Sequence, residues 1–157
     1  MLHIVLYQPE IPHNTGAVGR LCLATGARLH LIKPLGFSLE DKYLKRSGLD
    51  YWAEVDMRVW DSWEAFKSGL AKPSSSDTAR IAFIECQGVR PYWEADFSGD
   101  EDLYLMFGPE TRGIPTGIMA EAPEDMWQIP MQGTRSLNLA TAVAVVLYEA
   151  VRQRCVA

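Results

Sequence analysis

Three short segments of the sequence hold the residue types that could do chemistry, and the most constrained of them is 105–115. It reads Leu-Met-Phe-Gly-Pro-Glu-Thr-Arg-Gly-Ile-Pro, so two glycines and two prolines surround Glu110 and Arg112. A rigid loop of this kind suits a ligand held by backbone groups, with the two charged side chains as polar handles. The alternative is an ordinary strand-to-helix turn with surface charges.

The second segment, 14–20, places polar residues at the start of an expected helix. Asn14 is a good N-cap residue, and Gly16 allows another part of the chain to approach the backbone closely. Arg20 follows Asn14 by six residues, so the two side chains lie on different faces or turns. On its own, this segment also fits a capped helix that carries a surface arginine.

The third segment, 129–139, leads into a long apolar helix. Ser136 is a natural N-cap, and Asn138 is a polar group on an otherwise apolar first turn. A helix that is apolar on nearly every side is buried over most of its circumference. Either a partner subunit covers it, or it is the central core helix of a monomer.

The composition is that of an ordinary globular protein with one domain, 1–157. Hydrophobic residues make up 48% and charged residues 22% of the 157 residues, enough for a single sizeable core. The net charge of −5 argues mildly against a nucleic-acid ligand, because phosphate contacts need local positive charge. The stretch 20–46 has six basic residues against two acidic ones, so it is either a basic patch or an ordinary solvated surface.

The cysteines and histidines are too scattered for a disulfide framework or a local metal site. Cys22, Cys86 and Cys155 form no C-x-x-C pair, which fits a reducing compartment and no bound metal. The N-terminus has no basic region and no small-residue cleavage site. The longest apolar stretch, 137–148, is shorter than the roughly 20 residues that cross a bilayer. We therefore expect a cytoplasmic protein without a membrane segment.

Strand-like and helix-like segments alternate along the chain. Apolar runs predict strands at 2–7, 28–32, 55–60, 80–86, 103–107 and 126–130. Capping residues and apolar periodicity predict helices at 14–26, 38–48, 61–70, 116–121 and 137–154, with a polar connector at 72–78. This alternation indicates an α/β fold, a mostly parallel sheet with helices on both faces. Ligands in such sheets bind beyond the carboxyl ends of the strands, so the loops after Phe107 and Pro130 are the first candidates.

The usual nucleotide and hydrolase motifs are absent. No G-x-G-x-x-G follows a strand, and neither G-x-x-x-x-G-K-[ST] nor G-x-S-x-G occurs. A conventional dehydrogenase, a P-loop NTPase and an α/β-hydrolase are therefore disfavoured.

Taken together, the three segments resemble the motifs of the SPOUT family of RNA methyltransferases, in its 2′-O-ribose branch. Residues 14–20 resemble the first motif, 107–115 the second and 129–139 the third, and their order and separation agree over essentially the whole chain. The match is closest to the minimal TrmL-type (YibK-like) branch. Members of that branch methylate the ribose of the wobble nucleotide, cytidine or uridine, of leucine tRNAs.

The resemblance implies a C-terminal deep trefoil knot in the α/β fold, formed where the last segment threads through a loop. It also implies that S-adenosylmethionine (SAM) binds in the knot and leaves as S-adenosylhomocysteine, with no metal. The residues that would hold this cofactor are Ile84, Glu85, Gly108, Pro109, Glu110, Ile129, Met131, Ser136 and Leu137.

The resemblance further implies how the ribose is activated. The arginine of the first motif, here Arg20, would stabilise the oxyanion that forms on the 2′ oxygen, since an arginine is a poor base. The residues that would orient Arg20, the ribose and the cofactor are Asn14, Glu110, Ser136 and Asn138. Arg112 and Arg135 would contact phosphates.

The partners implied by the resemblance are a second copy of the chain and a tRNA. The family forms homodimers in which the partner chain completes each active site. We expect both subunits to bind the anticodon stem-loop, with the basic stretch 28–46 as the candidate surface. Two alternatives stay open: methylation of another tRNA or ribosomal RNA nucleotide, and a non-catalytic RNA-binding dimer.

Overall fold

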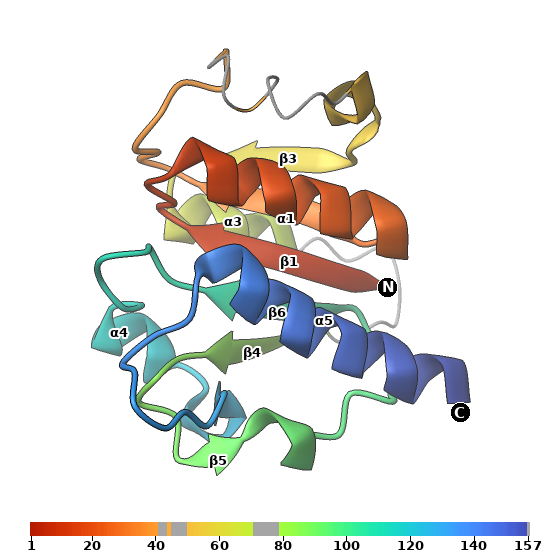
Figure 1. Ribbon diagram of the computed structural model, residues 1–157, viewed down its shortest axis with the longest axis vertical. Helices are drawn as coiled ribbons and strands as arrows, with labels where there is room; N and C mark the ends of the chain where they lie inside the picture. Colours follow the sequence, from red (N-terminus) through yellow and green to blue (C-terminus); the bar gives the residue numbers. More distant parts are fainter. Residues whose placement is uncertain (41–43, 45–49, 71–78, 157) are drawn as a thin grey trace.

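A single sheet of parallel strands forms the centre of the protein (Figure 1). The computed structural model describes residues 1–40, 44, 50–70 and 79–156. Within them the strands are β1 (Leu2–Tyr7), β2 (Arg28–Ile32), β3 (Met57–Trp60), β4 (Arg80–Ile84), β5 (Arg90–Pro91), β6 (Leu103–Phe107) and β7 (Met126–Gln128). The strand order is β3-β2-β1-β6-β4-β7-β5, and every pair is parallel.

Helices cover both faces of this sheet, as the sequence predicts. They are α1 (Pro12–Thr25), α3 (Trp63–Leu70), α4 (Thr116–Met119) and α5 (Leu139–Val156), with 3-10 turns η1 (Asp50–Glu54), η2 (Tyr92–Glu94) and η3 (Pro123–Asp125). Helices α1 and α5 lie side by side on the face turned toward the viewer in Figure 1. Helices α3 and α4 pack against the other face. Among the helices that the structure describes, none has the length and apolar character needed to span a membrane.

Alternating residues of the central strands pack into two separate hydrophobic cores, one on each face of the sheet. In β1, Ile4 and Leu6 belong to the core beneath α1 and α5, whereas Val5 belongs to the core beneath α3 and α4. In β6, Leu105 and Met106 divide in the same way. Strands buried on both faces are continuous apolar runs, and for this reason the sequence predicts these two strands at their observed bounds.

The start of α1 differs from its prediction. The helix begins at Pro12 with Ile11 at the N-cap, so Asn14 lies within the first turn and is not the capping residue. Proline is favoured at the first position of a helix because its missing N–H would have no partner there. Gly26, with φ of 71°, ends the helix as predicted. The side chain of Asn14 is therefore available for contacts outside the helix.

The start of α5 also differs. The helix begins at Leu139, and Asn138 caps it in place of the predicted Ser136. The Asn138 Oδ1 atom accepts a hydrogen bond of 3.2 Å from the backbone N–H of Thr141. An amide oxygen at this position satisfies one of the free N–H groups of the first turn.

Other bounds differ by a few residues or lie outside the described part of the chain. Strands β4 and β7 end at Ile84 and Gln128, earlier than predicted, and α4 is shorter than predicted. The short strand β5 and the 3-10 turns were not predicted, because two or three residues carry no readable periodicity. Most of the predicted helix 38–48 and the whole of the connector 72–78 lie outside the described residues.

The C-terminal segment inserts into an earlier part of the sheet. Strand β7 lies between β4 and β5, although β4 and β5 follow each other in the sequence. The chain from β4 to β5 therefore lies on both sides of β7. Insertion of a late strand into an earlier loop is the arrangement that the predicted trefoil knot requires.

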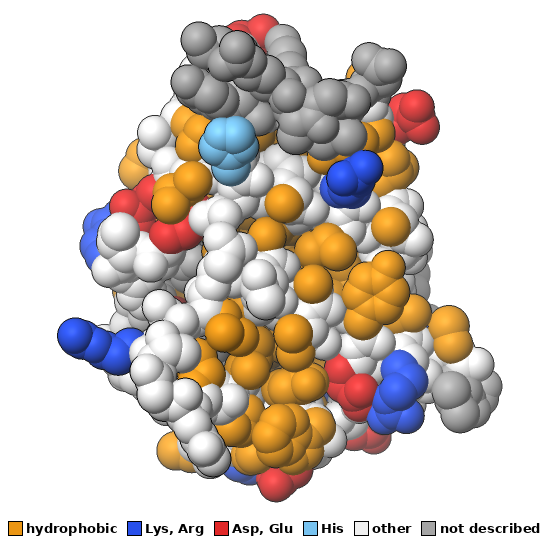
Figure 2. All heavy atoms as spheres, in the orientation of Figure 1, with side chains coloured by type: hydrophobic (Ala, Val, Ile, Leu, Met, Phe, Trp, Pro, Cys, Tyr) orange, Lys and Arg blue, Asp and Glu red, His pale blue; other side chains and the backbone are white. Residues whose placement is uncertain are grey.

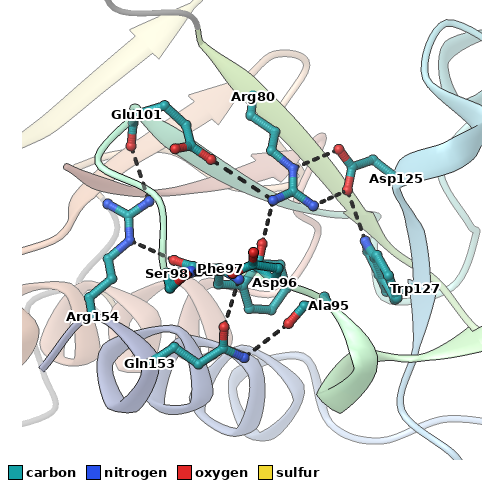
Figure 3. Close-up of polar contacts among 10 residues, drawn as sticks. All are labelled: Arg80, Ala95, Asp96, Phe97, Ser98, Glu101, Asp125, Trp127, Gln153 and Arg154. Atoms are coloured by element: carbon teal, nitrogen blue, oxygen red, sulfur yellow. Dashed lines mark hydrogen bonds and ion pairs between the residues drawn. The ribbon is translucent and has the colours of Figure 1, made fainter. Parts of the chain in front are cut away.

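Polar contacts hold the C-terminal half of α5 against the segment 95–101 (Figure 3). Gln153 accepts a hydrogen bond from the backbone N–H of Phe97 and donates one to the carbonyl of Ala95, and Arg154 donates to the carbonyl of Phe97. At the start of β4, both Nε and Nη2 of Arg80 donate to the carboxylate of Asp125. These contacts join the inserted segment to the loop that encloses it.

A buried pair of histidines lies beneath α3. Nδ1 of His3 and Nε2 of His30 are 3.0 Å apart, and Nε1 of Trp60 donates to Nδ1 of His30 over 2.9 Å. Because the indole N–H is only a donor, His30 must carry its proton on Nε2 and donate it to His3. Burial lowers the pKa of His3 to about 4 and that of His30 to about 3. The pair is therefore neutral in the folded protein at neutral pH.

We predict that this pair makes the protein less stable in mild acid. The unfolded rings titrate near pH 6.5, so between pH 6.5 and about 5 the unfolded chain takes up protons that the folded chain does not. The free energy of unfolding, measured by urea denaturation, should fall by up to about 1.4 kcal/mol per pH unit for each ring. Wild-type stability that stays constant over this range would contradict the prediction.

A double substitution tests whether His3 and His30 cause this pH dependence. His3→Leu combined with His30→Leu should flatten the pH dependence relative to the wild type.

Candidate active site

A pocket of about 550 Å³ lies at the carboxyl ends of β4, β6 and β7. This volume is within the range of about 300–1,000 Å³ that is usual for small-molecule sites. The loops after the three strands and the start of α1 line it. All nine predicted cofactor-binding residues are among its lining residues: Ile84, Glu85, Gly108, Pro109, Glu110, Ile129, Met131, Ser136 and Leu137.

The pocket also contains four of the five predicted catalytic residues, but not Arg20. Asn14, Glu110, Ser136 and Asn138 line the pocket. Arg20 lies on α1 six residues beyond Asn14, about 9 Å further along the helix axis. Its side chain is exposed, with the guanidinium 5.6 Å from the centre of the Tyr51 ring. The pocket of one chain is therefore formed without this arginine.

A chain of side-chain hydrogen bonds joins the three predicted motifs. Nδ2 of Asn138 donates to Oδ1 of Asn14 over 2.9 Å, and Nδ2 of Asn14 donates to Oε1 of Glu110 over 3.3 Å. These residues are brought together from α1, the loop after β6 and the start of α5. The two asparagines are capping or first-turn residues of the two helices, so the network fixes the helices' N-terminal ends relative to the loop.

The carboxylate of Glu110 completes the N-terminal end of α1. It accepts hydrogen bonds from the backbone N–H groups of Glu10 (2.7 Å) and Ile11 (3.0 Å). Helix α1 has no side-chain cap of its own and no acidic residue in its first turn. A carboxylate at this end satisfies free N–H groups and interacts favourably with the helix dipole. Glu110 therefore positions α1 against the loop.

Glu10, just before α1, accepts hydrogen bonds from the loop after β6 in the same way. Its Oε1 atom accepts hydrogen bonds from the backbone N–H of Thr111 (3.1 Å) and from the Thr111 hydroxyl (2.7 Å). These donors lower the pKa of Glu10. We call the exchange between Glu10, Ile11, Glu110 and Thr111 the loop clamp. Glu10 was missed by the sequence analysis, and the only local signal is a carboxylate between two prolines just before the helix.

The remaining lining combines apolar side chains with backbone polar groups. Ile84, Phe107 and Ile129 supply apolar surface, and Arg112 supplies a positive charge. Among the residues that the structure describes, no group of His, Cys, Asp and Glu could hold a metal ion. The pocket can bind and orient a ligand that has both an apolar and a polar part.

The predicted basic surface is partly paired with acidic residues. Arg28 lies 2.6 Å from the carboxylate of Asp56, and Lys33 lies 3.0 Å from that of Asp61. The other basic residues of 28–46 lie outside the described part of the chain. By contrast, Arg112 and Arg135 are exposed near the pocket, on two of the loops that form it.

Comparison with known proteins identifies the family. The model of the SpoU rRNA methylase family matches residues 1–148. The chain therefore belongs to this family.

A relative and two solved structures cover nearly the whole chain. The tRNA (cytidine(34)-2′-O)-methyltransferase of Methylovorus glucosotrophus is 49% identical over 155 residues, which are 98% of this chain and 96% of the relative. A structure described as giving insights into 2′-OH methylation of C/U34 on tRNA is 48% identical, with a TM-score of 0.89, and covers 100% of this chain and 98% of that one.

The second structure contains the cofactor AdoMet. It is the SpoU methyltransferase AviRb from Streptomyces viridochromogenes, 25% identical, with a TM-score of 0.85 over 99% of this chain and 58% of that one. These likenesses confirm the predicted SPOUT fold class.

We predict that the loop clamp contributes substantially to stability. Glu110→Ala removes the acceptor of two backbone N–H groups and should lower the free energy of unfolding by about 1–3 kcal/mol. Glu110→Gln keeps one acceptor oxygen and should cost less. Urea denaturation measures both, with Glu94→Ala, an exposed glutamate away from the pocket lining, as the control for the loss of charge. Equal stability of Glu110→Ala and Glu94→Ala would contradict the prediction.

Proposed function

We propose that the protein is a SAM-dependent tRNA methyltransferase that modifies the 2′ oxygen of the wobble ribose, cytidine or uridine 34, in leucine tRNAs. The observation that carries the proposal is the pocket, where three segments far apart in the sequence meet. The matched relative from Methylovorus glucosotrophus is named for the same reaction at cytidine 34. Leucine specificity rests on the resemblance of the motifs to the TrmL-type branch.

The pocket fits SAM by size and by the character of its lining. SAM has no phosphates, and the lining accordingly has no glycine-rich phosphate loop but three loops that offer apolar surface and backbone groups. When bound, SAM supplies a methyl group already activated by its sulfonium. The protein then has to hold the cofactor, exclude water and align the ribose oxygen with that methyl group.

Arg20 is the group that we assign to stabilising the oxyanion on the ribose. A guanidinium stays charged at neutral pH and offers several N–H donors, so it favours a developing alkoxide without removing the proton itself. The proton of the 2′-hydroxyl passes to water or to an RNA phosphate, and the cofactor leaves as S-adenosylhomocysteine. Asn14 and Asn138 orient the neighbouring groups through their amides. Because Arg20 does not line the pocket of its own chain, we propose that a second chain brings its Arg20 to each site.

The face formed by α1 and α5 is the surface that we assign to the second copy. Hydrophobic side chains gather there (Figure 2), and the exposed ones include Leu23 on α1 and Tyr148 on α5, at 38% and 50% exposure. An apolar face of this kind is typical of homodimer interfaces. Arg20 lies on α1, so the same contact would place the partner's Arg20 beside the pocket.

The tRNA would bind at the mouth of the pocket. The protein as a whole carries a charge of −5, so contacts to phosphates need positive charge close to the pocket. Arg112 and Arg135 supply that charge and are the candidates for these contacts. The anticodon loop is single-stranded, and its bases can be splayed out of the stack to expose a ribose.

The experiment that tests this function uses methyl-deuterated SAM and tRNA from cells that lack the enzyme. Nucleosides from the wild-type reaction are mapped by mass spectrometry, with Arg20→Ala as the inactive control that still binds SAM by calorimetry. We expect label on the 2′-O-methylated cytidine or uridine at position 34 of leucine tRNAs. Label on another ribose would overturn the proposed target, and SAM binding without any label would favour the non-catalytic RNA-binding dimer.

A further inference from the structure

Glu85 places a carboxylate inside the pocket at the end of β4. The residue is half-buried and belongs to the pocket lining. Its Oε1 atom accepts a hydrogen bond of 2.6 Å from the backbone N–H of Ile114, and its Oε2 atom accepts one of 3.2 Å from that of Cys86. The side chain is therefore held in one orientation by the loop after β6, through Ile114, and by its own segment after β4, through Cys86.

The loop after β6 is shaped around this carboxylate. A Cβ atom at Gly108 would lie 2.8 Å from Oε1 of Glu85 and 2.8 Å from the backbone nitrogen of Ile114. A Cβ atom at Gly113 would lie 3.2 and 3.3 Å from the two carboxylate oxygens. The two glycines that mark this loop in the sequence thus leave the space that Glu85 occupies.

The carboxylate of Glu85, which belongs to the pocket lining, has acceptor positions that none of its contacts in the described part of the chain uses. A carboxylate offers about four acceptor positions, and the backbone groups of Ile114 and Cys86 use two of them. Within the described part of the chain, Glu85 forms no salt bridge. Withdrawing an unpaired carboxylate from water is costly unless donors compensate it. A ligand that fills the pocket takes the water away, so it must bring a donor of its own.

From these contacts we propose that Glu85 binds the cofactor directly, by accepting hydrogen bonds from a donor group of SAM. This inference rests on the proposed function, because it takes SAM as the ligand. SAM has three kinds of donor group, and two of them suit a carboxylate best: the neighbouring hydroxyls of the ribose can donate to both oxygens, and the ammonium of the methionine part carries a positive charge. The neutral amino group of adenine offers neither advantage, so the proposal is confined to the ribose and the ammonium. Glu85 is then both the residue around which the loop closes and a determinant of cofactor affinity.

The test is a thermodynamic cycle between Glu85 and the ligand, measured by calorimetry without RNA. Wild type and Glu85→Gln are each titrated with S-adenosylhomocysteine, with 5′-methylthioadenosine, which lacks the ammonium, and with the 2′,3′-dideoxy form of S-adenosylhomocysteine. Glu85→Gln should lower the affinity for S-adenosylhomocysteine by about tenfold, which is the usual effect of losing a charged hydrogen bond. Glu94→Gln should leave its affinity unchanged.

The cycle separates a direct contact from a disturbed loop, because only a direct contact depends on the donor. If Glu85 binds the ribose, the dideoxy ligand should bind both proteins equally. If Glu85 binds the ammonium, methylthioadenosine should bind the wild type and Glu85→Gln equally. Equal weakening of all three ligands, or no weakening of any, would overturn the inference. Failure of S-adenosylhomocysteine to bind the wild-type protein at all would instead reject the proposed function.

Discussion

The structure depends above all on the exchange of carboxylates between two loops that are about a hundred residues apart in the sequence. Glu110 reaches from the loop after β6 to the N–H groups of Glu10 and Ile11, just before α1, and Glu10 reaches from there to Thr111. Each carboxylate satisfies backbone N–H donors that have no other acceptor within the described part of the chain. Parallel strands β1 and β6 are neighbours in the sheet, so their carboxyl ends bring the two loops within reach.

Other features of the site follow from this contact. Once α1 is fixed by Glu110, Asn14 can bond both to that carboxylate and to Asn138, which caps α5. The loop after β6 is held from its other side by Glu85 through Ile114. The pocket is therefore a rigid junction of four segments, which suits a site whose main task is to align two reactants.

Much of the fold could be predicted from the sequence, whereas the working of the site could be predicted only in part. Strands β1 and β6 are continuous apolar runs, and their bounds follow from that pattern alone. The residues of the pocket followed from the resemblance of three motifs to those of a known family. The role of Glu110 as a cap for α1, and the role of Glu10, depend on contacts between distant segments, which leave no periodic signal in the sequence.

The place of Arg20 illustrates the same limit. The spacing of six residues from Asn14 predicts a different face or turn of the helix, and the structure accordingly leaves Arg20 on the surface of α1, outside the pocket. The resemblance implies a role for Arg20 in the reaction, and for this reason we propose that a second copy of the chain supplies the arginine. We therefore propose that each chain builds a cofactor pocket and that its partner completes it.

Complementation between two inactive variants shows whether Arg20 acts in the pocket of its own chain or in that of the partner. Arg20→Ala keeps the pocket, whereas Gly108→Val fills it, since a Cβ at Gly108 already meets Glu85 and Ile114 at 2.8 Å. Each variant alone should transfer no methyl groups to tRNA. When both are expressed together, random pairing should restore about a quarter of the wild-type sites, because each mixed dimer has one site with an intact pocket and an intact partner's Arg20. No recovery in purified mixed dimers would contradict the account and place Arg20 in the site of its own chain.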